Sequence, residues 1–162
     1  MEIPETDQEG YDYDWFAIDS NGNIGHFASN TGILPHSVAK SAEDLKVLTD
    51  YFRSLKAEES NYLLANGFIF PRDIKTEEQR ENFLSTYVDY STRGLYSFDR
   101  NQPEKNWGFK PFLYGLITIP IKPLSMEYLP IHIREIIIRT VYNGNFSPNS
   151  NITNTLDIQD VS

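Results

Sequence analysis

Cysteine is absent from the 162 residues of this chain. Without thiols the chain forms no disulfide bond, offers no thiol nucleophile and supplies no thiolate ligand to a metal. The sequence also lacks the G-x-S-x-G, P-loop and dinucleotide-binding motifs that accompany nucleophilic hydrolysis, phosphoryl transfer and hydride transfer. These absences exclude several catalytic classes, and we predict no cofactor.

Long hydrophobic runs are also missing from the sequence. No stretch approaches the ~18 consecutive apolar residues that a membrane span requires. The first ten residues carry four acids and no apolar run, which does not fit a secretory signal. We therefore expect a cytoplasmic protein that does not enter a membrane.

Positive charge is scarce, because the chain has 14 Lys and Arg residues and 23 Asp and Glu residues, which gives a formal net charge of -9. This balance repels a phosphate backbone, so we predict no nucleic-acid ligand. The same negative field would speed encounter with a basic protein, although an acidic balance is also a common route to plain solubility. The charge permits a protein partner without identifying it.

Apolar and aromatic residues are abundant, at 40% and 14% of the chain. A chain of this mass buries roughly two thirds of its extended surface on folding, which is enough for a core without covalent staples. We predict one α+β domain over residues 1–142. Residues 143–162 are rich in Asn, Ser and Thr, and we predict that they form a mobile tail.

A β-hairpin is predicted over residues 14–29. Aromatic and β-branched residues flank the pair Asn21-Gly22, and this pair tolerates the positive φ angles of a type I′ turn. Such a pattern is the strongest short-range hairpin signal in a sequence.

Capping residues and apolar spacing predict two helices, at residues 41–56 and 76–91. Residues 130–139 fit either a strand or a helix, and we favour a helix. The fold class is therefore α+β, with an antiparallel sheet that contains the N-terminal hairpin and two to three helices packed on it. Further strands are predicted at residues 68–70, 95–98 and 112–119.

The three histidines, His26, His36 and His132, are far apart and show no metal-binding spacing. Asp19 to Gly22 resembles the start of a calcium loop, but the twelfth position is Asn30 where an EF-hand carries glutamate. We predict no metal site. The enzyme alternative is a small hydrolase or metal-dependent enzyme that uses His26, Asp19 and nearby carboxylates.

Acids and aromatic residues alternate around the first strand. The period of two places Asp12 and Asp14 on one face of the chain and Tyr11 and Tyr13 on the other. A solvated strand face explains this pattern, and an acidic surface bordered by tyrosines also suits protein binding. These four residues are the predicted partner-binding set, and charge reversal at Asp12 and Asp14 is expected to slow association while leaving stability nearly intact.

The hairpin residues carry a family resemblance. The run D-W-F-A-I-D at residues 14–19, with Gly22 and Ile24-Gly25-His26-Phe27, resembles the amino-terminal motif of small, largely uncharacterised bacterial proteins encoded beside polymorphic toxins. The stretches at residues 94–99 and 122–130 are also similar. The resemblance extends in order from about residue 12 to residue 139.

This resemblance implies an immunity-type role, in which the protein binds a cognate, basic toxin and blocks it by occlusion. It adds no catalytic residue. It also implies that the motif builds the hairpin rather than touching the partner. The residues expected in this structural role are Trp15, Asp19, Gly22, His26 and Phe27.

Overall fold

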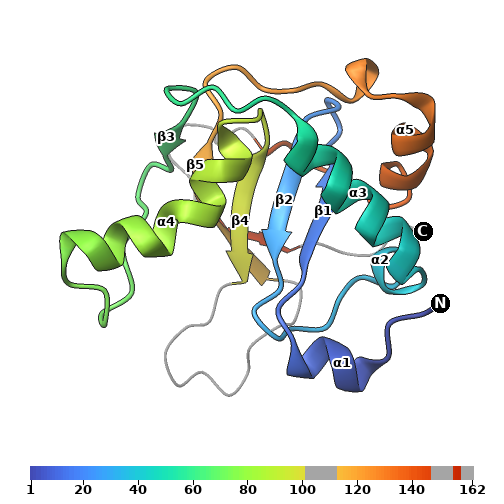
Figure 1. Ribbon diagram of the computed structural model, residues 1–162, viewed down its shortest axis with the longest axis horizontal. Coiled ribbons are helices and arrows are strands. Elements are labelled where there is room, and N and C mark those ends of the chain that lie inside the picture. The colour runs from blue at the N-terminus through green and yellow to red at the C-terminus, as the bar shows by residue number, and fades with distance from the viewer. Residues whose placement is uncertain (101–112, 147–154, 158–162) are drawn as a thin grey trace.

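The structure is a computed structural model that describes residues 1–100, 113–146 and 155–157. Helices pack against one mixed β-sheet whose strand pairs are mostly antiparallel, so the predicted α+β class is confirmed (Figure 1). The elements are α1 (Glu5–Gly10), β1 (Asp14–Ile18), β2 (Ile24–Ala28), α2 (His36–Ala39), α3 (Ala42–Ser54), β3 (Leu63–Leu64), α4 (Glu77–Ser91), β4 (Tyr96–Arg100), β5 (Leu113–Ile119), the 3-10 helix η1 (Met126–Tyr128), α5 (Ile131–Ile137) and β6 (Thr155–Asp157).

The strand order is β1-β2-β4-β5-β3, and β6 also pairs with β5. The hairpin β1-β2 is present as predicted, with Trp15 opposite Phe27. The expectation of a purely antiparallel sheet is wrong, because β2 and β4 run parallel, with His26 opposite Ser97. Parallel neighbours require a crossover connection, and here residues 29–95 provide it with α2, α3 and α4.

The hairpin turn differs from the predicted type. The backbone N–H of Gly22 donates to the carbonyl of Asp19 at 3.2 Å, and the φ of Gly22 is +79°. Asn21 does not adopt positive φ, whereas a type I′ turn needs positive φ at both central residues. The Asp19 carboxylate instead supports the turn by accepting the backbone N–H groups of Asn21 and Asn23, each at 2.9 Å.

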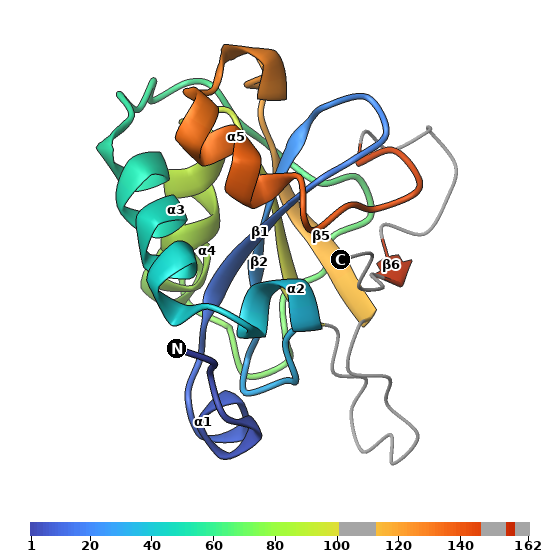
Figure 2. The same cartoon turned by 90° about the vertical axis from the view of Figure 1, so that its right-hand side faces the viewer.

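The two long helices form where their caps predict them. The Ser41 hydroxyl accepts the N–H of Asp44 at the start of α3, and Thr76 and Gln79 form a capping box on α4. The segment after Pro130 is the helix α5 rather than a strand. Helices α3 and α4 lie together on one face of the sheet (Figure 2).

Phe146, from beyond the predicted domain boundary, packs against the opposite face of the sheet. Phe146 is 2% exposed, and its ring lies 5.3 Å from Phe98 and 5.8 Å from Phe27. Packed structure therefore continues past residue 142. The strand β6 pairs with β5, and the other residues of the predicted tail lie outside the described residues.

One strand lies at a different position from the one predicted. Residues 68–70 are not a strand, and Leu63 and Leu64 pair with Ile119 and Thr118 instead. The predicted strand at residues 95–98 corresponds to β4. Of the strand predicted at residues 112–119, residue 112 lies outside the described residues and the rest is β5.

A stack of rings from neighbouring strands forms the centre of the core. The rings of Trp15 and Phe27 stack at 4.3 Å, and those of Phe27 and Phe98 at 4.7 Å. The indole N–H of Trp15 donates to the Tyr114 hydroxyl at 3.1 Å. In the part of the chain that the structure describes, no helix is long and apolar enough to cross a bilayer.

We expect Trp15→Ala to lower the free energy of unfolding by ~3 to 5 kcal/mol, because the side chain is fully buried and its loss leaves a cavity. Urea denaturation followed by circular dichroism measures this change. Tyr11→Ala, at a side chain that is 64% exposed, is the matched control and should shift stability by less than about 0.5 kcal/mol. Equal midpoints for Trp15→Ala and wild type would place the indole outside the core.

Candidate functional site

The sheet face beneath α3 and α4 carries a line of three polar side chains from three adjacent strands. His26 of β2 is at the centre, with Nε2 2.7 Å from Oδ1 of Asp14 and Nδ1 2.6 Å from Oγ of Ser97. Asp14 lies on β1 and Ser97 on β4, so the pairing of these strands places the three side chains in one row. We call these residues the Asp-His-Ser row.

The donors in this row follow from the charge of Asp14. An ionised carboxylate only accepts hydrogen bonds, so Nε2 of His26 carries the proton that it receives. Nδ1 of a neutral His26 then accepts the hydroxyl proton of Ser97. Serine, histidine and aspartate in this order are the residue types of nucleophilic hydrolysis.

The position of the row opposes catalysis. Both Ser97 and His26 are fully buried. The ring of Tyr90, from α4, stacks on His26 with centroids 3.9 Å apart. Each polar side chain of the row is hydrogen-bonded to its neighbour in the row, as buried polar side chains usually are.

Arg53 of α3 closes the outer end of the row. Its Nη2 donates to Oδ2 of Asp14 at 3.2 Å, and its Nε donates to the hydroxyl of Tyr90 at 3.1 Å. Burial favours a higher pKa for Asp14, but the hydrogen bond and charge of His26, together with Arg53, outweigh it and lower the pKa. Burial, with the Asp14 charge, raises the pKa of Tyr90 to about 12.

The structure divides the predicted partner-binding residues. Tyr11 and Asp12 are exposed, whereas Tyr13 is half-buried and its N–H donates to the Ser29 hydroxyl at 2.8 Å. Asp14 pairs with His26 and Arg53, so we expect its charge reversal to lower stability rather than to leave it nearly intact. A lysine at this position would face Arg53 and leave His26 without its acceptor.

Asp99, at the end of β4, adds a third carboxylate near this site. Burial is the main cause that raises the pKa of Asp99 to about 6, and the charge of Asp12 adds to it. The hydroxyl of Tyr87 donates to Asp99 and opposes the rise. Burial and the nearby carboxylates raise the pKa of Tyr87 in turn, so this hydroxyl remains a donor.

Asp19 lies away from His26, at the turn of the hairpin. Its Oδ2 accepts the backbone N–H of Phe146 at 2.9 Å, in addition to its contacts within the turn. The grouping of His26 with Asp19 that the enzyme alternative needs is therefore not formed. Among the residues that the structure describes, no three His, Asp or Glu side chains are grouped so that they could hold a metal.

The three segments that carry the family resemblance meet in space. The carbonyl of Gly22 in the hairpin accepts the N–H of Met126 at 2.8 Å, and the carbonyl of Gly94 accepts the N–H of Leu124 at 2.9 Å. A Cβ on Gly94 would lie 2.7 Å from Cβ of Leu124, so the close approach requires glycine. Together with burial of Trp15 and Phe27, these contacts give the motif residues structural roles.

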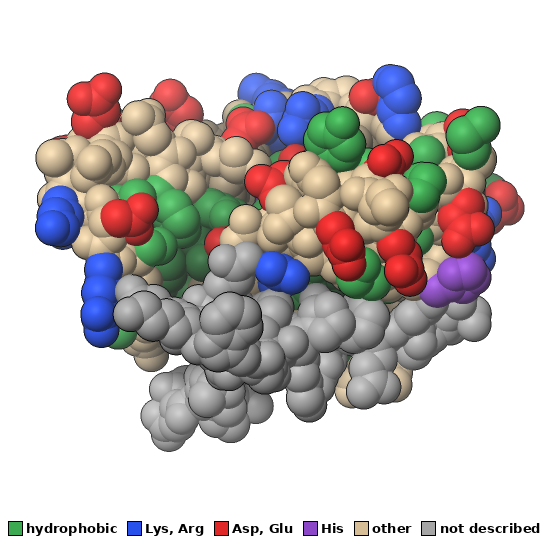
Figure 3. Space-filling view, turned by 90° about the horizontal axis from the view of Figure 1, so that it is seen from below, with side chains coloured by type: hydrophobic (Ala, Val, Ile, Leu, Met, Phe, Trp, Pro, Cys, Tyr) green, Lys and Arg blue, Asp and Glu red, His purple; other side chains and the backbone are tan. Residues whose placement is uncertain are grey.

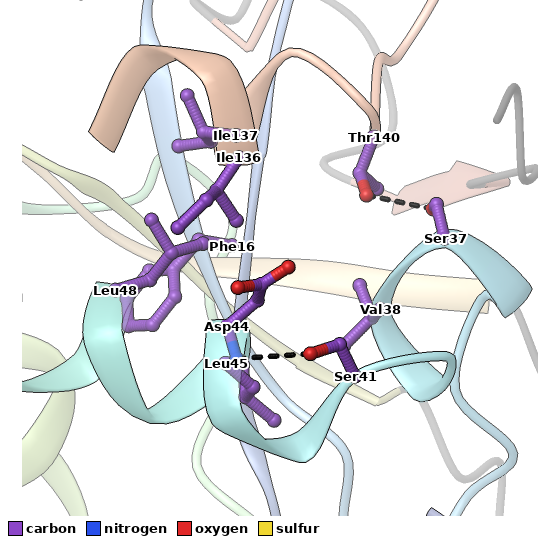
Figure 4. A pocket seen from close by; sticks show the side chains of 10 residues that line it. All are labelled: Phe16, Ser37, Val38, Ser41, Asp44, Leu45, Leu48, Ile136, Ile137 and Thr140. Atoms are coloured by element: carbon purple, nitrogen blue, oxygen red, sulfur yellow. Dashed lines mark hydrogen bonds between the residues drawn. The ribbon is translucent and has the colours of Figure 1, made fainter. Parts of the chain in front are cut away.

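A crevice lies between α3 and α5, above Phe16 of β1 (Figure 4). The Asp44 carboxylate lies among its apolar side chains and pairs with Arg139, and Ser37 and Thr140 hydrogen-bond at its rim. Its cavity volume is about 10 Å³, which is room for about one water molecule. The crevice is too small to serve as a substrate site.

Comparison with family models, curated proteins and solved structures finds no match to this chain. The resemblance to immunity-type proteins therefore stays a prediction.

Several residues of the site were missed by the sequence interpretation. Ser97 and Arg53 lie far from His26 along the chain, and only the parallel pairing and the helix packing bring them near it. The capping residues and apolar spacing predicted the helix that carries Tyr87 but not the bond of this residue to Asp99. The alternation around β1 did identify Asp14 as a strand residue facing away from Trp15.

We expect Asp99→Asn to stabilise the protein at pH 7.5 by on the order of 2 kcal/mol. The pKa of Asp99 is raised from 3.8 to about 6, so its charge opposes folding above pH 6, and this cost disappears as the pH falls toward 3.8. Wild-type stability should therefore gain from Asp99 between pH 7 and pH 4, and the variant should lose that gain. Asp14, with its lowered pKa, stabilises above 3.8 and loses this contribution only at lower pH.

Urea titrations of wild type and variant from pH 4 to pH 7.5 measure this effect. Asp50→Asn, at an exposed acid on α3, is the control and should leave the pH profile of wild type unchanged. Parallel profiles for wild type and Asp99→Asn would contradict the argument.

Proposed function

We propose that this chain is a non-catalytic binding protein that occludes a basic protein partner, in the manner of an immunity protein bound to the toxin encoded beside it. The observation that carries this proposal is a set of exposed carboxylates on an anchored N-terminal segment. Acidic side chains gather over α1 on the face shown in Figure 3. The exposed acids of this segment are Glu2, Glu5, Asp7, Glu9 and Asp12.

Contacts with the body of the protein hold this segment in place. The N–H of Ile3 donates to the carbonyl of Ala39 at 2.7 Å, and the buried amide of Gln8 bonds both the carbonyl of Ile3 and the N–H of Leu34. Carboxylates on an ordered backbone bind a basic surface without the entropic cost of ordering a loose segment. Tyr11, at 64% exposure, supplies an aromatic contact beside them.

The test is a binding titration against the protein encoded beside this gene, at low and high salt. Asp12→Lys should slow association about tenfold at low salt and flatten the salt dependence, because an exposed charge acts mainly on the encounter rate. Asp12 is exposed, so the melting temperature should stay near that of wild type. Glu135→Lys, the same charge change at an exposed site on α5, is the control and should alter association less.

Tight binding that ignores both salt and Asp12→Lys would remove the acidic segment from the mechanism. Absence of binding by the wild type would remove the occlusion function itself.

The runner-up is a hydrolase, and the observation in its favour is the order of the Asp-His-Ser row. It requires Ser97 to become accessible, and a fluorophosphonate probe, which labels reactive serines, tests this directly. We expect no label on Ser97, because its hydroxyl is fully buried against His26. Labelling of wild type that is lost in both Ser97→Ala and His26→Gln would favour the hydrolase.

A further inference from the structure

The two halves of α4 differ in how they meet the rest of the protein. Its buried side chains, Tyr87, Tyr90 and Ser91, all lie in the C-terminal half. Thr118 of β5 fastens this half by donating to the carbonyl of Tyr87 at 3.1 Å. In the N-terminal half, residues 77–82 are exposed, and the apolar side chain of Phe83 is only half-buried.

Three half-buried rings, of Phe68, Phe70 and Phe83, lie along this part of α4, and Phe83 also approaches the buried ring of Tyr87. Phe83 lies 6.1 Å from both Phe68 and Phe70, which are 4.9 Å apart, and 5.6 Å from Tyr87. We call these four rings the aromatic hollow. Figure 3 shows hydrophobic side chains gathered in a hollow on the side of the molecule where α4 lies.

Phe70 and Phe83 stand apart from the main core of the described residues. Their rings contact each other and the neighbouring rings, and the guanidinium of Arg80 lies 5.2 Å from the centroid of Phe70. Substitution of these rings should therefore cost less stability than substitution of the buried Trp15.

Carboxylates border the hollow at the Tyr87 end. The hydroxyl of Tyr87 bonds Asp99, and the charges of Asp14 and Asp12 also act on it. Arg53 balances Asp14 and the charge of Arg100 acts on Asp99, whereas Asp12 points its charge to solvent. The hollow thus offers ring faces along its length and negative charge at one end.

We propose that the aromatic hollow and its acidic border form the centre of a docking surface for a partner segment that carries arginine or lysine beside an apolar side chain. The apolar group would lie on the rings of Phe70 and Phe83, and the cation would approach Asp12 and Asp99. Aromatic faces and carboxylates both attract guanidinium groups, and the position of Arg80 over Phe70 is an example within this chain.

The charge of the chain favours a basic partner over a second copy. A second copy would carry the same net charge of -9 and would be repelled. This inference rests on the proposed function, to which it adds an apolar centre whose acidic border includes Asp12 of the N-terminal segment. An aromatic centre with a charged rim is the usual anatomy of a protein interface.

The experiment uses the full chain with two probes. The first is the protein encoded beside this gene, and the second is a short synthetic peptide of alternating arginine and leucine, with a glutamate-leucine peptide as its control. Phe70→Ser and Phe83→Ser should each weaken binding of the first probe by about tenfold or more. Tyr128→Ser, at an aromatic side chain that is 74% exposed on η1, is the matched control and should change binding less than about twofold.

A variant that is expected to tighten binding distinguishes a loss of contacts from a loss of folding. Arg80 is exposed and covers the Phe70 ring, so Arg80→Ala should uncover the hollow and tighten binding of both cationic probes about threefold. In the wild type, the arginine-leucine peptide should shift the backbone amide resonances of residues 68–70 and 83–87, and the glutamate-leucine peptide should not.

The outcomes separate the two proposals. If the neighbouring protein binds Phe70→Ser, Phe83→Ser and Arg80→Ala as it binds wild type, occlusion stands and this docking surface is overturned. If the neighbouring protein does not bind wild type but the arginine-leucine peptide shifts those amides, the surface stands and the proposed partner is wrong. If neither probe binds wild type, both proposals fail.

Discussion

Stacking of rings across strands sets the register on which the rest of the sheet depends. Trp15 stacks on Phe27 within the hairpin, and Phe27 stacks on Phe98 across the parallel pair. Side chains alternate between faces along a strand, so a slip of one residue in β4 would turn Phe98 to the other face and bring Ser97 against the rings. The same packing requires glycine at position 25, because a Cβ there would lie 2.8 Å from the Phe27 ring and 3.0 Å from the Phe146 ring.

The same register forms the polar row on the other face. When Phe27 lies opposite Phe98, His26 lies opposite Ser97, and when Trp15 lies opposite Phe27, Asp14 lies within reach of His26. A slipped sheet would lose the ring stack and would also leave His26 buried without partners. Buried polar groups that are satisfied in only one arrangement disfavour the alternatives strongly. The conspicuous histidine of the hairpin is therefore best understood as a residue that helps to specify the fold.

Local features of this fold were predictable from sequence, and long-range ones were not. The hairpin and the starts of α3 and α4 depend on residues within a few positions, such as Ser41 and Thr76. The parallel pairing of β2 with β4 depends on side chains that are distant in sequence, and nothing near His26 indicates Ser97. The burial of Phe146 was not predicted, because a single aromatic residue does not alter the polar composition of the stretch around it.

The candidate site follows the same division. Strand alternation separated Asp14 from the face of Trp15, but it could not distinguish a solvated carboxylate from one paired with Arg53, which α3 supplies. The sequence did not indicate Asp99 as a site residue, because its partial burial depends on packing from α4.

The crossover between β2 and β4 also bears on how the chain folds in time. The hairpin closes over a short loop and is expected to form early, whereas the pairing of β2 with β4 requires the intervening residues 29–95 to be brought together first. Closing contacts of such high sequence separation slows folding, because chain entropy is lost before the contacts form. A hairpin formed before β4 pairs would leave one edge of β2 unpaired, and we expect the chain to be prone to aggregation at that stage.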